Sequence, residues 1–238
     1  MYEATGQVLS WARKQMHKLA AERILEISKE FKEGFEFLEN YPKSVTFFGG
    51  NQVREDNPYY ADARLLSSRL VKELGYTIVT GGGPGIMEAA NRGAVEAGGN
   101  SIGLLIQLPD AQVINKYITS SFALYYFFVR KVCLSFSAEA FIFYPGGFGT
   151  LDEFFEILTL VQTRKIINTP IICVGSEYWN KLKVFIEEEL TSRGAILPEE
   201  VNLFHIADDH SEIVEIIKKV PVRVVVPLTA QFEKEYQR

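Results

Sequence analysis

Residues 76–94 read YTIVTGGGPGIMEAANRGA, and this stretch decides the fold. The run 76–80 is short, apolar and rich in β-branched residues, which predicts a buried strand. The glycine-rich turn 81–85 follows directly, and a helix is expected from there to Ala97, ended by two glycines. A buried strand that runs through such a turn into a helix indicates a parallel βαβ unit.

The same alternation of strand and helix continues along the whole chain. Strands are expected at 45–48, 76–80, 101–106, 140–143 and 170–174, with a weak one at 203–206. Helices are expected in the opening segment up to 40–42, at 59–74, 86–97, 151–163, 177–193 and 211–219. A loop is expected at about 108–120, followed by one more helix that runs through Arg130 to about Leu134. The strands are apolar along their length, which predicts a doubly wound α/β fold, a parallel sheet with helices on both faces.

No internal repeat, low-complexity tract or Pro/Ser-rich linker divides the sequence. We therefore expect a single domain over 1–238, with an N-terminal helical extension at 1–40 and a C-terminal tail at 221–238.

Charge and hydropathy exclude several classes of protein. The 25 Lys and Arg against 30 Asp and Glu give a net charge of −5, which argues against a nucleic-acid polymer as partner. The longest apolar run, 122–129, is far shorter than the about 20 residues that span a membrane. The first 25 residues carry several charges and no unbroken apolar stretch, so we expect no signal peptide and a soluble, cytoplasmic protein.

Cysteine and histidine give no sign of a metal site or a disulfide framework. Cys133 and Cys173 lie in apolar surroundings and are expected to be buried thiols of a reducing compartment. His17, His205 and His210 are scattered without the spacing of metal ligands.

The turn GGGPG at 81–85 is suited to binding an anion. Glycines let a ligand approach the backbone closely, and the helix behind the turn offers its partial positive charge to a group such as phosphate. Pro84 is expected in the first helical turn, where its missing N–H needs no partner. The turn matches neither GxGxxG, since position 86 is Ile86, nor the Walker motif. A tight strand–helix turn without a ligand stays open as an alternative.

A second turn, PGGFGT at 145–150, repeats this arrangement after the strand 140–143. Thr150 is the expected N-cap of the next helix. Glu153 either completes a capping box with Thr150 or places a carboxylate beside a phosphate-binding turn, and spacing alone slightly favours the cap. The pair Arg130-Lys131, taken alone, is more often a solvated helix end than a site.

Taken together, GGGPGIMEAANRGA (81–94), FFVRK (127–131) and PGGFGTLDE (145–153) resemble the Lonely Guy (LOG) family. Its members are cytokinin riboside 5′-monophosphate phosphoribohydrolases, formerly labelled lysine decarboxylases. The similarity runs from about Val45 to Trp179, and the long opening helix resembles the extended bacterial subgroup. The resemblance implies a Rossmann-like fold and cleavage of the N-glycosidic bond of a purine nucleoside 5′-monophosphate, AMP or N6-modified AMP, to free base and ribose 5-phosphate, as in cytokinin biosynthesis.

The resemblance also implies roles for individual residues. Arg130 and Glu153 match the family's essential arginine and glutamate. The positions that match its substrate-binding residues are Gly81, Gly82, Gly83, Gly85, Lys131, Gly146, Gly147, Gly149, Thr150 and Thr159. The implied reaction requires neither a metal nor an organic cofactor, and the implied assembly is a homodimer or a set of dimers.

Bond cleavage builds positive charge on the ribose, which a nearby carboxylate stabilises. We therefore expect Glu153 to bind the ribose hydroxyls and stabilise the oxocarbenium-like transition state, with activation of water left open. Arg130 is expected to orient the substrate and assist departure of the base. The 5′-phosphate is expected on the backbone amides of 146–150.

Two segments depart from the family pattern. After the first strand this chain has Gly-Gly-Asn-Gln at 49–52 in place of Gly-Ser-Ser/Ala-Arg, and Ala111-Gln112 stand in place of Glu-Gln. A nucleotide- or cofactor-binding carrier of the same fold is therefore the alternative function. A pyridoxal-phosphate decarboxylase is disfavoured, because no lysine has a recognisable cofactor-anchoring context.

Overall fold

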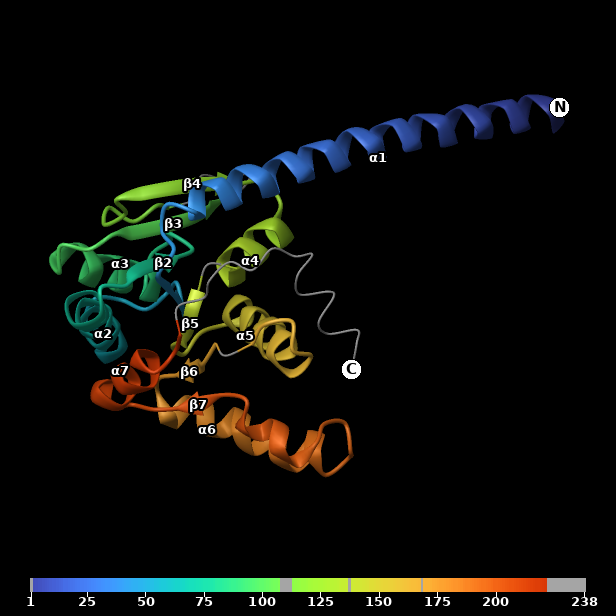
Figure 1. The fold of residues 1–238 in the computed structure, drawn as a ribbon. Coiled ribbons are helices and arrows are strands. Elements are labelled where there is room, and N and C mark those ends of the chain that lie inside the picture. Colours follow the sequence, from blue (N-terminus) through green and yellow to red (C-terminus); the bar gives the residue numbers. More distant parts are fainter. Residues whose placement is uncertain (1, 108–112, 137, 168, 222–238) are drawn as a thin grey trace.

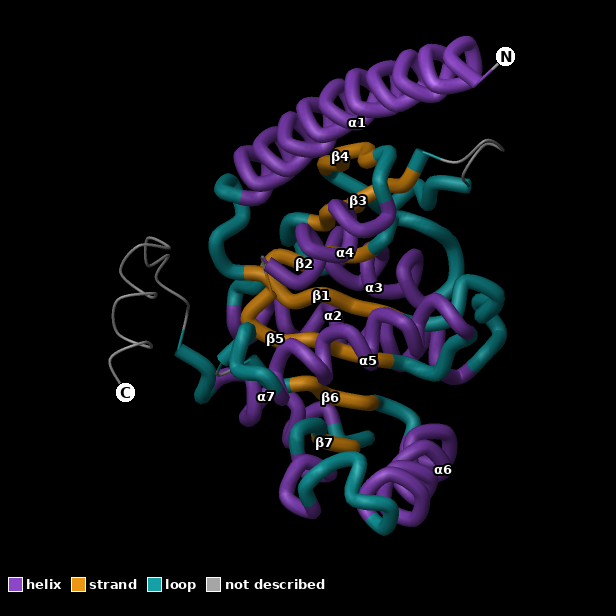
Figure 2. Tube along the Cα trace, turned by 90° about the vertical axis from the view of Figure 1, so that its right-hand side faces the viewer, coloured by secondary structure: helices purple, strands orange, loops and turns teal. Residues whose placement is uncertain are grey.

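The computed structural model describes residues 2–107, 113–136, 138–167 and 169–221, with the backbone alone for 2–14 and 17. Its centre is a parallel sheet of seven strands in the order β4-β3-β2-β1-β5-β6-β7 (Figure 2). The strands are β1 Ser44–Phe48, β2 Thr77–Thr80, β3 Ser101–Ile106, β4 Ser120–Leu124, β5 Ala138–Phe143, β6 Ile171–Cys173 and β7 His205–Ile206. The doubly wound α/β fold expected from the sequence is confirmed.

Helices cover both faces of the sheet (Figure 1). They are α1 Tyr2–Leu38, α2 Pro58–Leu74, α3 Ile86–Glu96, α4 Phe127–Phe136, α5 Phe148–Gln162, α6 Ser176–Phe185 and α7 His210–Lys218. A π-helical turn, Ile186–Thr191, extends α6, and a short 3-10 turn spans Pro198–Asn202. Helices α2, α3 and α7 lie on one face and α4, α5 and α6 on the other, while α1 crosses α4 and β4.

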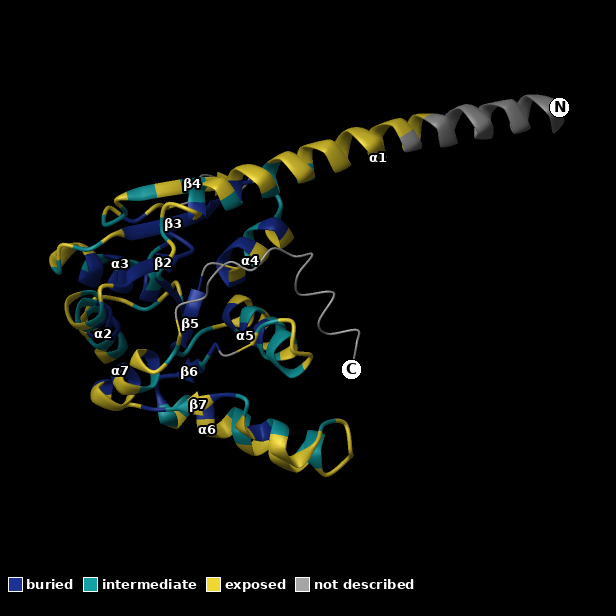
Figure 3. Ribbon diagram, viewed as in Figure 1, coloured by how far each residue is buried: buried dark blue, intermediate teal, exposed yellow. Residues whose placement is uncertain are grey.

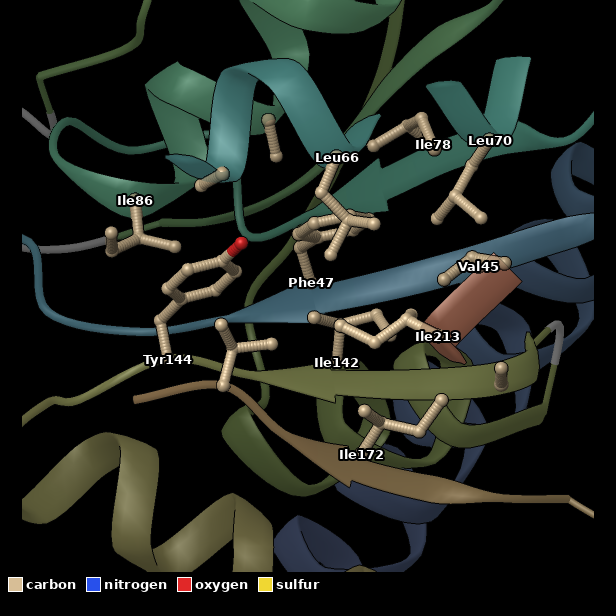
Figure 4. Packing of buried hydrophobic residues seen from close by; sticks show 14 of the residues in the cluster. Val45, Phe47, Leu66, Leu70, Ile78, Ile86, Ile142, Tyr144, Ile172 and Ile213 are labelled. Atoms are coloured by element: carbon tan, nitrogen blue, oxygen red, sulfur yellow. The ribbon is translucent and has the colours of Figure 1, made fainter. Parts of the chain in front are cut away.

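Each face of the sheet has its own apolar core, because strands such as β1 and β5 are buried along their whole length. One core packs alternate residues of these strands, such as Val45, Phe47 and Ile142, against Leu66 and Leu70 of α2 (Figure 4). The other core lies under α4, α5 and α6, where Trp179 is fully buried. The two cores explain why the strand segments read as continuous apolar runs.

The strand order indicates at which edge of the sheet a ligand is expected to bind. The chain runs outward from β1 through β2 and β3 to β4, and then returns to the other side of β1 with β5. In open α/β sheets, ligands bind beyond the carboxyl ends of the strands where the order reverses. Here the loops after β1 and β5 meet at that point, where the Gly50 N–H donates to the Pro145 carbonyl at 3.0 Å.

The sequence-based boundaries hold well where capping residues mark them. Asn57 accepts a hydrogen bond from the Tyr59 amide at the start of α2, and Gly75 ends that helix with φ +69. Both cysteines are free and buried, as expected.

Three local expectations were wrong. The sequence predicts loop and helix where the structure has β4, because this edge strand has exposed residues alternating with partly buried ones and runs into an aromatic stretch. α5 begins at Phe148 with Gly147 as its N-cap, so Thr150 lies inside the first turn and caps nothing. Pro84 lies before α3, whose N-cap is Gly85.

Helix α1 extends well past the rest of the molecule (Figures 1 and 3). Its C-terminal part packs on α4, where Gly34 permits a close approach: a Cβ there would lie 2.9 Å from Sγ of Cys133. The projecting part bears exposed apolar side chains, among them Met16, Leu19 and Leu25. Among the described helices, none has the length and apolar character to cross a membrane. The expected tail at 221–238 falls outside the described residues beyond Pro221.

Candidate functional site

The two glycine turns, α4 and the start of α5 come together at the carboxyl edge of the sheet. The turn 81–85 follows β2, and the turn 145–150 follows β5, on opposite sides of β1. Helix α4 brings Arg130 against the first turn, and α5 carries Glu153 behind the second. The fold thus joins segments that lie far apart in the sequence into one candidate site.

Arg130 is fixed by two backbone carbonyls. Its Nε donates to the Leu104 carbonyl at 2.8 Å, and its Nη2 donates to the Gly81 carbonyl at 3.3 Å. A Cβ on residue 81 would overlap Nη2, so only glycine leaves room for the guanidinium. Nη1 has no hydrogen-bond partner among the described residues and remains available for a ligand. Burial lowers the pKa of Arg130, with Glu153 opposing, yet an arginine stays protonated at neutral pH.

The first glycine turn is held by a buried network of side chains. Thr80 Oγ1 accepts from the Gly82 amide at 2.9 Å and donates to Asn91 Oδ1 at 2.7 Å. Asn115 donates from Nδ2 to Asn91 Oδ1 and to the Gly83 carbonyl, both at 2.9 Å. The turn's own polar groups are thus largely used within the protein. In this geometry the turn seats Arg130 through the Gly81 carbonyl.

Gly85 locks the first turn against the loop after β1. It has φ +73, and a Cβ there would overlap the Gly50 carbonyl. That carbonyl accepts a hydrogen bond from the Ile86 amide at 3.1 Å. The departure from the family pattern at 49–52 therefore lies directly beside the site, whereas Ala111 and Gln112 fall outside the described residues.

The second glycine turn leaves its amides free. No side chain caps α5 and no acidic residue lies in its first turn. The backbone N–H groups of 146–150 have no hydrogen-bond partner among the described residues. A Cβ on Gly147 or Gly149 would meet nothing within 4 Å, so packing within the protein does not require glycine at either position. Glycine also weakens a helix, so helix stability does not explain these glycines. Free amides, a helix N-terminus and open space are the features that anion-binding sites use.

Glu153 lies behind this turn, where it is partly buried and lines a small pocket between α4 and α5. Burial raises the pKa of its carboxyl to about 7, and the attraction of Arg130 works in the opposite direction. The nearby Asp152 raises it further. A carboxyl with a pKa near neutrality, beside a cationic group, is typical of functional sites.

Lys131 is paired with two acids of α5. Its Nζ lies 3.0 Å from Asp152 Oδ2 and 2.6 Å from Glu156 Oε2. Burial works against the charge of Lys131, but these hydrogen bonds prevail and its pKa is raised. The pairing ties α4 to α5 and so fixes Arg130 relative to Glu153.

The two threonines expected at the site differ in position: Thr150 lies at the second glycine turn, and Thr159 does not. Thr150 is buried beside Gly146, where any Cβ would overlap its hydroxyl. Thr159 is exposed and donates to the Phe155 carbonyl at 2.7 Å. It lies nine residues beyond Thr150 on α5, about 14 Å along a helix, so the structure does not bring it to the turn.

Several neighbours of the site were missed in the sequence. Asn115 and Tyr178 donate to carbonyls of the two glycine turns, and Asn91 accepts from Thr80 and Asn115 behind the first turn. Each of the three lies on a segment that follows the carboxyl end of a strand. Their position after the strand ends was the one feature of the sequence that could have indicated these residues. Among the described residues, no group of three or more His, Cys, Asp or Glu side chains could hold a metal ion.

Comparison with known proteins gives consistent matches. A family model described as "Possible lysine decarboxylase" matches residues 87–217. A cytokinin riboside 5′-monophosphate phosphoribohydrolase of Arabidopsis thaliana is 27% identical over 208 residues, which are 85% of this chain and 90% of that protein. A protein of the same name from Rhodococcoides fascians is 28% identical over 151 residues, 61% of this chain and 75% of the relative.

A solved structure of a molybdenum cofactor carrier protein from Chlamydomonas reinhardtii is also similar. It covers 75% of this chain and 98% of its own, with a TM-score of 0.55 and 22% sequence identity. At this identity the likeness shows a shared fold.

Proposed function

Because the chain belongs to the Lonely Guy family, we propose that it hydrolyses the N-glycosidic bond of a purine nucleoside 5′-monophosphate, AMP or N6-modified AMP. The observation that carries the proposal is the juxtaposition of unpartnered backbone amides at 146–150 with Arg130 and Glu153. A phosphate, a positive charge and a carboxylate are what this substrate requires at one place.

The 5′-phosphate is proposed to bind at the N-terminus of α5. The amides of 146–150 supply donors, and the open space at Gly147 and Gly149 lets the phosphate oxygens reach the backbone. The helix dipole adds favourable charge without any basic side chain. This is how a chain with a net charge of −5 can bind an anion.

Glu153 is proposed to act as a carboxylate. It binds the ribose hydroxyls and stabilises the positive charge that develops at the ribose as the bond between C1′ and the base nitrogen breaks. The bonding electron pair leaves with the base, which takes up a proton. A water oxygen then bonds to C1′ and loses a proton, giving ribose 5-phosphate.

Arg130 is proposed to orient the substrate and assist departure of the base. Two of its nitrogens are held by the Leu104 and Gly81 carbonyls, which leaves Nη1 as a preorganised donor. Preorganised donors stabilise developing charge more than mobile ones, since no reorganisation is needed during the reaction. The reaction as proposed requires neither a metal nor an organic cofactor.

We further propose that two copies of the chain associate through the outer face of α4. Phe128, Val132 and Phe136 recur there every four residues and are 47%, 38% and 51% exposed. Phe31 and Phe35 of α1 extend this apolar face, with ring centroids 6.4 Å from Phe128 and 4.6 Å from Phe136. An exposed apolar surface of this kind favours association with a second copy of the chain.

A carrier without turnover is the second candidate. The residues at 49–52, which replace a serine and an arginine of the family pattern, favour it, because they lie beside the first glycine turn. In this case the same amides at 146–150 would hold a phosphate group of a nucleotide or cofactor that leaves unchanged.

Release of base separates the two candidates. Purified protein is incubated with AMP and N6-isopentenyl-AMP, and free base is followed by chromatography, with Glu153→Gln as the control. The proposal predicts base from at least one nucleotide with the native protein and a large loss in the variant. Nucleotide binding without any release of base would favour the carrier. Equal activity in Glu153→Gln would retain the reaction and remove Glu153 from its role.

A further inference from the structure

Tyr178 reaches from α6 to the second glycine turn. Its hydroxyl donates to the Gly146 carbonyl at 2.9 Å. This residue lies outside the segments that resemble the family's substrate-binding motifs, and the catalytic scheme above gives it no role.

The position of Tyr178 is fixed from several sides. Its amide donates to the Gly175 carbonyl at 3.0 Å, and its ring packs edge-on against the buried Trp179. The turn before it is held by Asp208, whose Oδ1 accepts from the amides of Gly175 and Ser176 at 2.8 and 3.1 Å. A Cβ on Gly175 would approach Pro145 to 3.0 Å, so this turn packs directly on the start of the second glycine turn.

The hydrogen bond from Tyr178 has a consequence on the other side of the peptide unit. The carbonyl of Gly146 and the N–H of Gly147 belong to one planar trans peptide, in which the two bonds point in opposite directions. Holding the carbonyl toward α6 therefore directs the Gly147 N–H away from α6. This N–H has no acceptor among the described residues, and a Cβ on Gly147 would meet nothing within 4 Å, so a ligand can approach this residue.

The preceding peptide is held in the same way. The Pro145 carbonyl accepts from the Gly50 amide at 3.0 Å, which directs the Gly146 N–H away from the loop after β1. The amides of Gly146 and Gly147 are thus both oriented, each by a hydrogen bond that the carbonyl of the same peptide unit accepts. Backbone N–H groups that the protein orients in advance are suited to binding an anion.

We propose that Tyr178 is a positioning residue for phosphate: its hydroxyl holds the Gly146 carbonyl and thereby aims the Gly147 N–H at the 5′-phosphate of the substrate. The inference rests on the proposed function for the identity of the anion. It assigns Tyr178 to binding of the phosphate and leaves bond cleavage to Arg130 and Glu153.

Tyr178→Phe removes the hydroxyl and keeps the ring that packs on Trp179. The matched control is Tyr76→Phe, which removes a hydroxyl next to the start of β2, at the opposite edge of the sheet. Binding of ribose 5-phosphate and of ribose is measured by calorimetry for the three proteins, and KM and kcat are measured with AMP and adenosine.

We expect Tyr178→Phe to weaken ribose 5-phosphate binding by about 3- to 10-fold, the range that the loss of one neutral hydrogen bond produces. KM for AMP should rise by the same factor with little change in kcat. Tyr76→Phe should match the native protein, and ligands without phosphate should not distinguish the variants. A merely structural role for Tyr178 would affect both ligand classes alike.

The outcomes separate this inference from the proposed function. Unchanged ribose 5-phosphate affinity in Tyr178→Phe, or equal weakening toward ribose, overturns the role of Tyr178 while base release can still stand. A native protein that binds ribose 5-phosphate but releases no base overturns the hydrolase, and the Tyr178→Phe arm still decides the inference. A native protein with no affinity for ribose 5-phosphate overturns the inference.

Discussion

The guanidinium of Arg130 occupies the space in which a side chain on Gly81 would begin. Nη2 donates to the Gly81 carbonyl at 3.3 Å, and a Cβ at that position would overlap this nitrogen. The first glycine of the GGGPG turn is therefore explained by an arginine that follows it by 49 positions in the chain. Glycine here serves the placement of Arg130, the arginine to which we assign a role in the proposed reaction.

Gly81→Ala should accordingly abolish most activity by displacing Arg130. Loss of one preorganised donor costs about 100- to 1,000-fold in kcat in other enzymes, and we expect a loss of this order. The check is a double-mutant cycle: in an Arg130→Ala background nothing remains to be displaced, so Gly81→Ala should add little. Fully additive losses would show that the alanine acts through some other part of the fold.

Gly149→Ala should stabilise the protein and weaken its function. Position 149 lies in the first turn of α5 with open space around it, so alanine fits and favours the helix by about 0.5–1 kcal/mol. The same methyl group occupies space that we assign to the phosphate. Thermal unfolding and the affinity for AMP should move in opposite directions, and unchanged AMP affinity would argue against a phosphate at this turn.

Glu153 should make both activity and stability depend on pH near neutrality. Its carboxyl has a pKa of about 7, against an ordinary value of 4.5, because burial disfavours the charged form. If the carboxylate is the active form, kcat/KM should fall about tenfold per pH unit below 7. Asp152→Asn removes a charge that raises this pKa, so the acid limb should shift to lower pH. A loss of activity above pH 7 would instead identify Glu153 as a proton donor.

The effect on stability has the opposite sign to that of a salt-bridged carboxylate. Between pH 4.5 and about 7 the native protein holds a proton that the unfolded chain has lost, so the free energy of unfolding falls as pH rises. The penalty is fully present above the folded pKa and has an upper limit of roughly 3 kcal/mol. Glu153→Gln should therefore stabilise the protein at pH 8 and have little effect at pH 4.

The outer face of α4 should mediate self-association. Val132→Glu places a charge in the middle of the apolar stripe, and we expect sedimentation velocity at micromolar concentration to show a monomer in place of a dimer. Val184→Glu on α6 is the matched control, since Val184 is also partly exposed, at 47%. A native protein that sediments as a monomer would contradict the proposed interface.

Much of the fold could be predicted because its strands are buried on both faces. Continuous apolar runs such as 45–48 and 101–106 have one plausible environment, a parallel sheet under helices. Strand β4 is not predictable in this way, because it lies at the sheet edge and its residues alternate between exposed and partly buried, as in an amphipathic segment. The start of α5 was misplaced because Thr150 is a common N-cap, whereas an uncapped helix N-terminus leaves no sequence signal.

The sequence motifs of the candidate site could be predicted, but the contacts that hold these motifs in place could not. Glycine turns and the pair Arg130-Lys131 stand out in the sequence, but the pairing of Lys131 with Asp152 and Glu156 depends on how α4 packs on α5. The contact between Tyr178 and the Gly146 carbonyl likewise depends on the strand order, which puts β6 next to β5. Long-range contacts of this kind require the topology.

Equimolar appearance of adenine and ribose 5-phosphate from AMP is the measurement that tests the central claim most directly. Both products are quantified over time with the native protein, and adenosine serves as the substrate without phosphate. We predict that the two products appear together, and that adenosine is cleaved far more slowly because it lacks the group that binds at 146–150. Bound AMP recovered intact after prolonged incubation, together with the same result for N6-isopentenyl-AMP, would contradict the claim.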